Sequence, residues 1–511
     1  MAAARSLRSL RSLRPRWTLC IAACAVTLAA VLLPGGVAAS QPSRLAKPPK
    51  PRPAAASPAV TGPVTGGHGA ILLGGTSFDL AQVGYEQSEF FLSGKATAYQ
   101  PVGVLGSDGR WSVTAGPTAR YTTRIVVDRP TSREKFNGVV YVEWLNVSFQ
   151  LDVAPDWIMA HNELIRDGFA WVGVSAQGIG VNAAKASDPV RYGPLAHPGD
   201  SYSYDIFSQA GQAVRNSAAT ILGGLKPHTV LAAGESQSAF RMTTYIDAVH
   251  PLVNVFDGFM VHSRGSASAP LEQAPLPDVR TPPVVFIRTD LRVPVLTFET
   301  ETDLLLLNFL AARQDDSASF RLWEVAGTAH ADTYTLGIGF SDTGTGPGDI
   351  ALFNSMLNPP SNPLGLFSCP VPINAGEQHY VFDTAVRDLG RWARNGDVPP
   401  RAAHLRIDPR PPASFRLDSN GNVEGGIRTP AVDVPVAKLS GLGQSGGSFC
   451  FIFGTTVPFD AAKLANLYPT HHDFVRRWDH DTRKDVRAGF ILPFDGQKLE
   501  AAAAASNVRR P

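Results

Sequence analysis

The stretch VLAAGESQSAF, residues 230–240, decides how the rest of the sequence is interpreted. An apolar, strand-like run leads through Gly-Glu-Ser-Gln-Ser directly into residues that favour a helix. A serine at such a turn is either a nucleophile raised above the backbone or an ordinary cap of the helix. The segments before and after the turn have to decide between these two interpretations.

Strand-like and helix-like segments alternate on both sides of this turn. Apolar strands separated by amphipathic helices indicate a mostly parallel sheet with helices on both faces. In such sheets, sites form where loops leave the carboxyl ends of the strands, and Gly234-Glu235-Ser236 lies at such an end. The predicted strands are 90–99, 120–130, 138–146, 169–176, 229–236, 255–263, 293–300 and 320–327, and the predicted helices include 156–168 and 205–225.

The two ends of the chain differ in composition from its middle. An arginine-rich start, an apolar run and the small residues of VAAS predict that residues 1–39 are a signal peptide, so that the protein is secreted or extracytoplasmic. The alternative is an uncleaved membrane anchor, the only interpretation that places the protein at a membrane. We expect a Pro/Ala-rich linker over 40–66, one α/β domain over 67–500 with a loop-rich C-terminal extension, and a disordered tail over 501–511.

The overall composition argues against several classes of function. Charged residues make up 18% of the chain and the formal net charge is +2, which gives no reason to expect a nucleic-acid partner. The sequence HHDF, residues 471–474, offers two adjacent histidines without a third ligand, so we predict no metal site. No phosphate-binding or dinucleotide-binding motif follows a predicted strand, so we predict no cofactor. The sequence leaves the oligomeric state open.

Two later segments favour the nucleophile interpretation of Ser236. A serine hydroxyl needs a histidine that takes its proton and an acid that orients the histidine. Asp303 follows the strand-like segment 293–300, and His330 follows the strand-like segment 320–327. The order serine, acid, histidine is that of α/β-hydrolases, although Ser238 stands where the G-x-S-x-G motif has its last glycine. We therefore predict a catalytic triad of Ser236, Asp303 and His330.

The acid is the least certain member of this triad. Glu299, Glu301 and Asp303 all have odd numbers, so the alternation along a strand does not separate them. We favour Asp303, keep Glu301 as the alternative acid, and interpret the remaining carboxylates as surface charges. His262 also follows a predicted strand, but it precedes the acid in the chain and is expected to hydrogen-bond near the site.

Two backbone N–H groups are expected to form an oxyanion hole. One belongs to Gln237, the residue after the nucleophile. The other is expected from the loop after the strand VVYVEWLN, where Asn146 and Val147 are the two candidates.

The cysteines divide into two pairs. Cys20 and Cys24 lie in the predicted signal peptide, which leaves Cys369 and Cys450 in the mature chain. Export exposes both thiols to an oxidising compartment, and a disulfide between them is therefore expected.

Taken together, the quoted segments resemble the bacterial "α/β hydrolase domain" proteins, a family of large exported hydrolases. The resemblance extends over roughly residues 70–495, and it implies the α/β-hydrolase fold and a serine hydrolase site on Ser236 and His330. The segments that carry it are VEWLNVS, RYGPLAHPGDSYSYDIFSQAGQAVR, GESQSAFR, VPVLTFETETD, LWEVAGTAHAD and GGIRTPAVDVPVAKLSG.

The leading hypothesis is a secreted serine hydrolase that cleaves a small carboxylic ester through an acyl-enzyme. The choice of ester over amide rests on analogy with this fold, which hosts many esterases. A peptidase, amidase or acyltransferase with the same triad is the alternative among enzymes. A catalytically inactive binding protein on the hydrolase scaffold is the alternative outside them.

Overall fold

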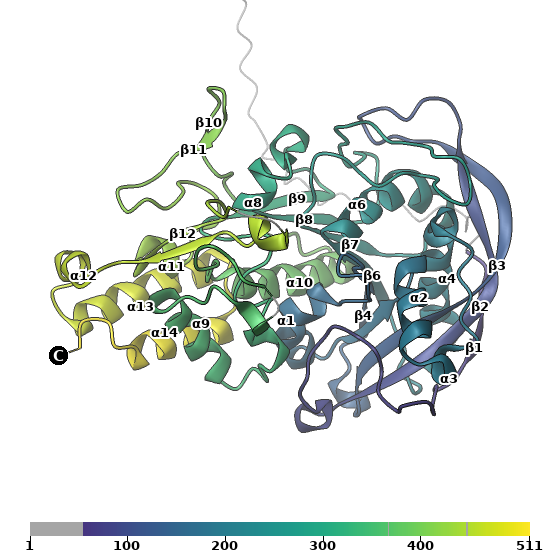
Figure 1. Ribbon diagram of the computed structural model, residues 1–511, viewed down its shortest axis with the longest axis horizontal. Helices are drawn as coiled ribbons and strands as arrows, with labels where there is room; N and C mark the ends of the chain where they lie inside the picture. Colours follow the sequence, from purple (N-terminus) through teal and green to yellow (C-terminus); the bar gives the residue numbers. More distant parts are fainter. Residues whose placement is uncertain (1–54, 366, 446–447, 511) are drawn as a thin grey trace, which may run out of the picture. The chain divides into compact units, whose positions relative to one another are not determined.

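The computed structural model describes residues 55–365, 367–445 and 448–510 (Figure 1). The predicted signal peptide, residues 1–39, lies outside the described residues, as does the predicted linker up to residue 54.

A nine-stranded sheet forms the centre of the described chain, in the order β1-β2-β3-β5-β4-β6-β7-β8-β9. The six strands from β5 to β9 in this order are parallel, whereas β1, β2 and β3 pair antiparallel and β3 joins β5 antiparallel. The strands are β1 Ala59–Thr61, β2 Tyr85–Pro101, β3 Val113–Pro130, β4 Val139–Trp144, β5 Ala170–Val174, β6 Thr229–Glu235, β7 Gly258–His262, β8 Val295–Thr300 and β9 Phe320–Val325. All eight strands predicted from the sequence are therefore present, and the predicted fold class is confirmed.

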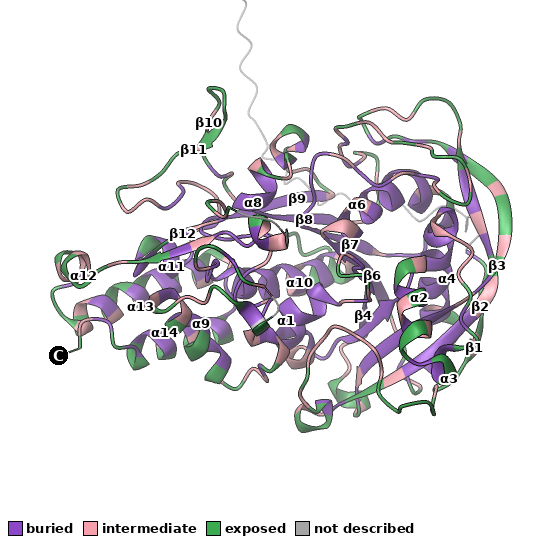
Figure 2. Cartoon of the chain, in the orientation of Figure 1, coloured by how far each residue is buried: buried purple, intermediate pink, exposed green. Residues whose placement is uncertain are grey.

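Both faces of the parallel strands are buried, which explains why these strands have almost continuous apolar sequences (Figure 2). In β4, Val140, Val142 and Trp144 belong to one hydrophobic cluster, whereas Val139 and Tyr141 belong to a second cluster. Because successive side chains of a strand point to opposite faces, each cluster fills the space between the sheet and one layer of helices.

Different helices cover the two faces. Apolar residues of α4 (Ser203–Asn216) and α6 (Gln237–Thr244) fill the first cluster. Apolar residues of α1 (Pro155–Arg166) and α10 (Gln378–Asn395) fill the second, and these two helices lie together in Figure 1. Helix α1 corresponds to the helix predicted over 156–168. The helix predicted over 205–225 is too long, because α4 ends at Asn216 and the short helix α5 (Ala218–Ile221) follows it.

The described part of the predicted linker is not an unstructured spacer throughout. Strand β1 lies inside it and pairs with β2, for example Val60 with Leu92. A strand added to the edge of a sheet is held by its backbone groups, so a segment without large apolar residues still forms it.

The predicted disordered tail is also wrong over most of its length. Helix α14 runs from Pro493 to Ala505, and both Ala503 and Val508 are buried. Alanine has the highest helix propensity, and a small alanine face packs closely against a neighbouring helix.

The C-terminal extension contains more helix than the sequence analysis predicted. Its long helices are α9 (Pro347–Leu357), α10, α13 (His471–Ala488) and α14. Proline-rich and glycine-rich loops separate them, and these loops hid the helical periodicity of the segments between. The extension packs against the sheet, because α10 contributes to the same cluster as α1.

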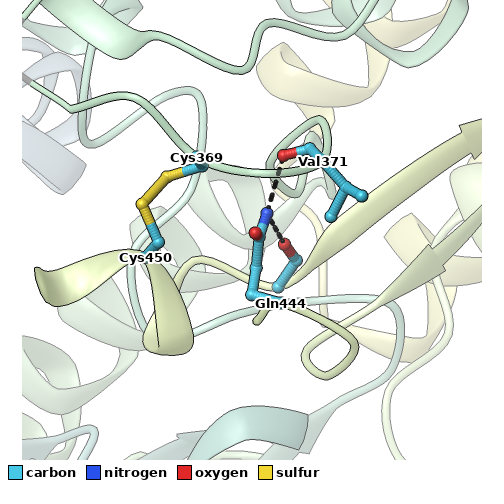
Figure 3. Close-up of a disulfide and its surroundings, with 5 residues drawn as sticks. Cys369, Val371, Gln444 and Cys450 are labelled. Carbon is cyan, nitrogen blue, oxygen red and sulfur yellow. Dashed lines mark hydrogen bonds between the residues drawn. A yellow bond between two sulfur atoms is a disulfide. The ribbon is translucent and has the colours of Figure 1, made fainter. Parts of the chain in front are cut away.

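The loops of this extension are crosslinked. Cys369 and Cys450 form the expected disulfide, and Gln444 donates hydrogen bonds from its side-chain amide to the carbonyls of Val371 and Gly454 beside it (Figure 3). Among the described residues, none of the helices combines the length and the apolar character that crossing a bilayer requires.

Candidate active site

Ser236 lies on a sharp turn between β6, which ends at Glu235, and α6, which begins at Gln237. Its backbone has φ 54° and ψ −120°, a conformation that costs free energy for a residue other than glycine. The Ser236 N–H donates to the carbonyl of His262 on β7 at 2.9 Å, which fixes the turn to the neighbouring strand. The serine side chain is thereby raised at the carboxyl end of the sheet.

The residues on either side of the turn explain its sequence. A Cβ atom at Gly234 would lie 2.7 Å from the carbonyl oxygen of Ser238, so this position requires glycine. Ser238 is fully buried and donates from its hydroxyl to the carbonyl of Leu145 at 3.3 Å. The departure from G-x-S-x-G therefore places a small polar side chain against the loop that follows β4.

The structure brings the three predicted triad residues together. His330 Nε2 lies 2.7 Å from Ser236 Oγ, and His330 Nδ1 lies 2.6 Å from Asp303 Oδ1. His330 and Asp303 are buried, while Ser236 is partly exposed. A continuous line of hydrogen bonds thus runs from a buried carboxylate to the hydroxyl of a partly exposed residue.

Asp303 is held in place by the start of helix α8 (Glu301–Leu305). Its Oδ2 accepts hydrogen bonds from the N–H and the hydroxyl of Thr300, both at 2.7 Å, in a capping box. Its other oxygen is left for His330.

The other two carboxylates of this segment have different contacts. Glu301 accepts the N–H of Gly327 at 2.6 Å and the N–H of Gly441 at 2.8 Å, so it joins loops rather than orienting His330. Glu299 accepts the N–H of Arg264 at 3.4 Å. Both are fully buried, and the burial of Glu299 corrects the expectation that the carboxylates other than Asp303 and Glu301 are surface charges. Burial raises the pKa of Glu301 to about 7.

The carboxylates around His330 make it more basic. Burial alone lowers the pKa of a histidine, but the negative charges of Asp303 and Glu235 and the hydrogen bond to Asp303 outweigh it. The pKa of His330 is therefore raised above its ordinary value.

The two predicted oxyanion donors from the loop after β4 differ in availability. The N–H of Asn146 donates to the carbonyl of Val153 at 2.9 Å and is therefore not free to bind an oxyanion. This corrects the prediction of Asn146 as a backbone donor. Within the described chain, no protein group accepts a hydrogen bond from the N–H of Val147. Gln237 is the first residue of α6, where the N–H has no partner inside the helix. Gln237 and Val147 thus remain as the candidate pair.

Glu235 is a member of the site that the sequence analysis did not single out. Its Oε1 lies 3.4 Å from His330 Nε2, and its Oε2 accepts the side-chain amide of Asn146 at 3.0 Å. Its position beside Ser236 was visible in the sequence, but its contact with a histidine far along the chain depends on the fold.

A second histidine–aspartate pair lies beside the site. His262 is the register partner of Glu235 on β7, and its Nδ1 lies 2.7 Å from Asp156 Oδ1. The amide of Gln378 lies 3.2 Å from His262 Nε2, and the ring stacks on Phe382. His262 hydrogen-bonds near the site, as expected, although not to a triad member through its side chain.

A family model described as "Alpha/beta hydrolase domain" matches residues 60–501. The chain belongs to this family. The match includes most of β1 and most of α14, in agreement with the structure, and it confirms the resemblance inferred from the sequence. No curated protein matches this α/β hydrolase.

Solved structures show distant similarities to this α/β hydrolase. An α/β serine hydrolase without a lid from Xanthomonas campestris is 14% identical, covers 46% of this chain and 86% of its own, and has a TM-score of 0.25. A thermostable esterase from Pseudomonas putida is 12% identical, covers 49% of this chain and 75% of its own, and has a TM-score of 0.23. Similarities at this level carry no argument about substrate.

Proposed function

We propose that this α/β hydrolase is a secreted serine hydrolase that cleaves carboxylic esters through an acyl-enzyme on Ser236. The observation that carries the proposal is the line of hydrogen bonds from Asp303 through His330 to Ser236, at 2.6 and 2.7 Å. A strained nucleophile turn at the carboxyl end of a buried strand supports the same role for the serine.

The contacts support a two-step mechanism. His330 Nε2 takes the proton of Ser236 as Oγ bonds to the ester carbonyl carbon, and Asp303 stabilises the imidazolium through Nδ1. The N–H groups of Gln237 and Val147 stabilise the oxyanion of the tetrahedral intermediate. Its collapse transfers the proton from His330 to the departing alcohol, and a water molecule, activated in the same way, then releases the acid.

A fluorophosphonate probe tests the nucleophile without knowledge of the substrate. The purified protein should be labelled on Ser236, and Ser236→Ala should remain unlabelled. Labelling that persists in Ser236→Ala, or an unlabelled wild-type protein, would contradict the proposal. A panel of nitrophenyl esters and matching anilides then separates an esterase from an amidase, with faster turnover expected on the esters.

The disulfide supports export, because such bonds persist in oxidising compartments. Mass spectrometry of the non-reduced protein from the culture medium or the periplasm should find peptides of Cys369 and Cys450 joined. A free N-terminus near residue 40 in the same sample would locate the cleavage of the signal peptide. Two thiols that react with an alkylating agent before reduction would contradict the crosslink.

A further inference from the structure

Glu235 brings a second buried carboxylate to the histidine of the site. Asp303 lies at His330 Nδ1, whereas Glu235 Oε1 lies 3.4 Å from Nε2, the nitrogen that exchanges a proton with Ser236. Glu235 is 7% exposed, and within the described chain no arginine or lysine forms an ion pair with it. A carboxylate in this position is not required to orient the histidine, because Asp303 already does so.

The loop after β4 fixes the Glu235 side chain. The side-chain amide of Asn146 donates to Glu235 Oε2 at 3.0 Å and to the Glu235 carbonyl at 3.2 Å. Two hydrogen bonds from one amide hold the carboxylate against its own backbone. Oε1 is thereby left facing His330.

The interaction between the Glu235 carboxylate and His330 Nε2 differs between the resting and the reacting state of the site. In the resting state, the lone pair of a neutral His330 Nε2 accepts the Ser236 proton, and an ionised Glu235 gains little from it. Once the Ser236 O–H bond breaks and the proton moves to Nε2, a positive imidazolium stands beside the Glu235 carboxylate. An interaction that is stronger in the transition state than in the ground state accelerates the chemical step.

We propose that Glu235 is a positioning residue for the reaction: its carboxylate stabilises the imidazolium form of His330 from the Nε2 side, opposite Asp303. This inference rests on the proposed function of Ser236 and His330. It also assigns a role to Asn146, which holds the carboxylate instead of donating its N–H to the oxyanion.

Other ionisable groups around Glu235 bear on its charge. His330 approaches it from the loop after β9, Asp303 from α8, His262 from β7 and Asp156 from α1. Burial raises the pKa of Glu235 to about 7, although the two histidines act to lower it. Burial favours the neutral acid and the two histidines favour the carboxylate, so the charge of Glu235 beside His330 depends on pH.

The pH dependence of fluorophosphonate labelling tests this role. In Glu235→Gln, removal of the negative charge lowers the pKa of His330, so the acidic limb of the labelling rate should move to lower pH by about one unit. The rate on the plateau should fall about tenfold, because one pKa unit of imidazolium stabilisation corresponds to a factor of ten.

Two further variants make the test specific. Glu235→Asp retains the charge on a shorter side chain, and its limb should lie between those of the wild type and Glu235→Gln. Glu163→Gln is the matched control: Glu163 is also buried, burial raises its pKa to about 8, and its partners are Arg166 and Arg387. Its limb should coincide with that of the wild type.

The outcomes separate this inference from the proposed function. If the acidic limb of a folded Glu235 variant stays at the wild-type position, the role of Glu235 is overturned. This holds even if Ser236 is labelled. A wild-type protein that is not labelled on Ser236 overturns the proposed function instead. Thermal unfolding of each variant shows whether a lost rate reflects a lost fold.

Discussion

Two buried histidine–aspartate pairs lie near the carboxyl ends of the parallel strands, and only one of these two has a hydroxyl at Nε2. The distances from Nδ1 to Oδ1 are 2.6 Å for His330 and Asp303, and 2.7 Å for His262 and Asp156. At Nε2, His330 meets Ser236, whereas His262 meets the amide of Gln378. The pair itself is a common device for fixing an imidazole ring, so its function depends on the third partner and on access from solvent.

The largest expected loss of kcat follows from removal of the Ser236 hydroxyl or of its partner His330. Ser236→Ala and His330→Ala should each lower kcat on the order of 10⁶-fold, and the double variant should be little worse because the residues act as a unit. Stopped assays on the best nitrophenyl ester measure these losses. Near-wild-type hydrolysis by Ser236→Ala would show that the serine hydroxyl does not distinguish the pair of His330 and Asp303 from the pair of His262 and Asp156.

Replacement of the acid should give the next largest effect. Asp303→Asn should lower kcat on the order of 10⁴-fold, because the amide no longer holds the tautomer that accepts the serine proton. Glu301→Gln should change kcat far less, since its contacts are the backbone N–H groups of Gly327 and Gly441. The opposite ranking would transfer the role of the acid to Glu301.

The pH dependence of the wild-type enzyme should follow from the raised pKa of His330. A raised pKa keeps the imidazole protonated to higher pH, and a protonated Nε2 accepts nothing from Ser236. The rate should therefore fall as the pH drops through a value above about 6.5, the ordinary pKa of histidine, by about tenfold per unit. A midpoint below that value in kcat/KM measurements would contradict the electrostatics of the site.

The smallest effect on turnover is expected at the other pair. His262→Phe keeps a ring against Phe382 but leaves Asp156 with Tyr141 as its side-chain hydrogen-bond partner within the described residues. An uncompensated buried carboxylate should lower the free energy of unfolding by about 3 kcal/mol, while kcat per folded molecule stays within about tenfold. Urea unfolding and active-site titration measure the two quantities separately. A loss of kcat comparable to that of His330→Ala would mean that both pairs take part in the chemistry.

The sequence predicted the positions that depend on local structure. Ser236 and His330 each follow a buried strand, and an apolar run that ends in a turn is visible without the fold. The sequence alone did not show which carboxylate contacts His330, because the strand ends at Thr300 and the chain continues as helix α8. Alternation along a strand therefore no longer governs Glu301 and Asp303.

The remaining members of the site depend on long-range contacts. Glu235 reaches His330 across 95 positions of sequence only because β6 and the loop after β9 end at the same edge of the sheet. Asn146 was predicted to use its backbone, and the bond of its N–H to Val153 reverses that role. A hydrogen bond within one short loop is enough to change which atoms of a residue face the reaction.

The contacts of Gly441 also bear on when the site is completed during synthesis of the chain. Thr302 donates from its hydroxyl to the Gly441 carbonyl at 2.6 Å and accepts the N–H of His330 at 3.2 Å, while Glu301 binds the Gly441 N–H. A ribosome synthesises Ser236, Asp303 and His330 long before it reaches this brace. The nascent chain therefore contains the three residues of the proposed triad before the contacts of Gly441 can form, and we expect their final alignment late in its biogenesis.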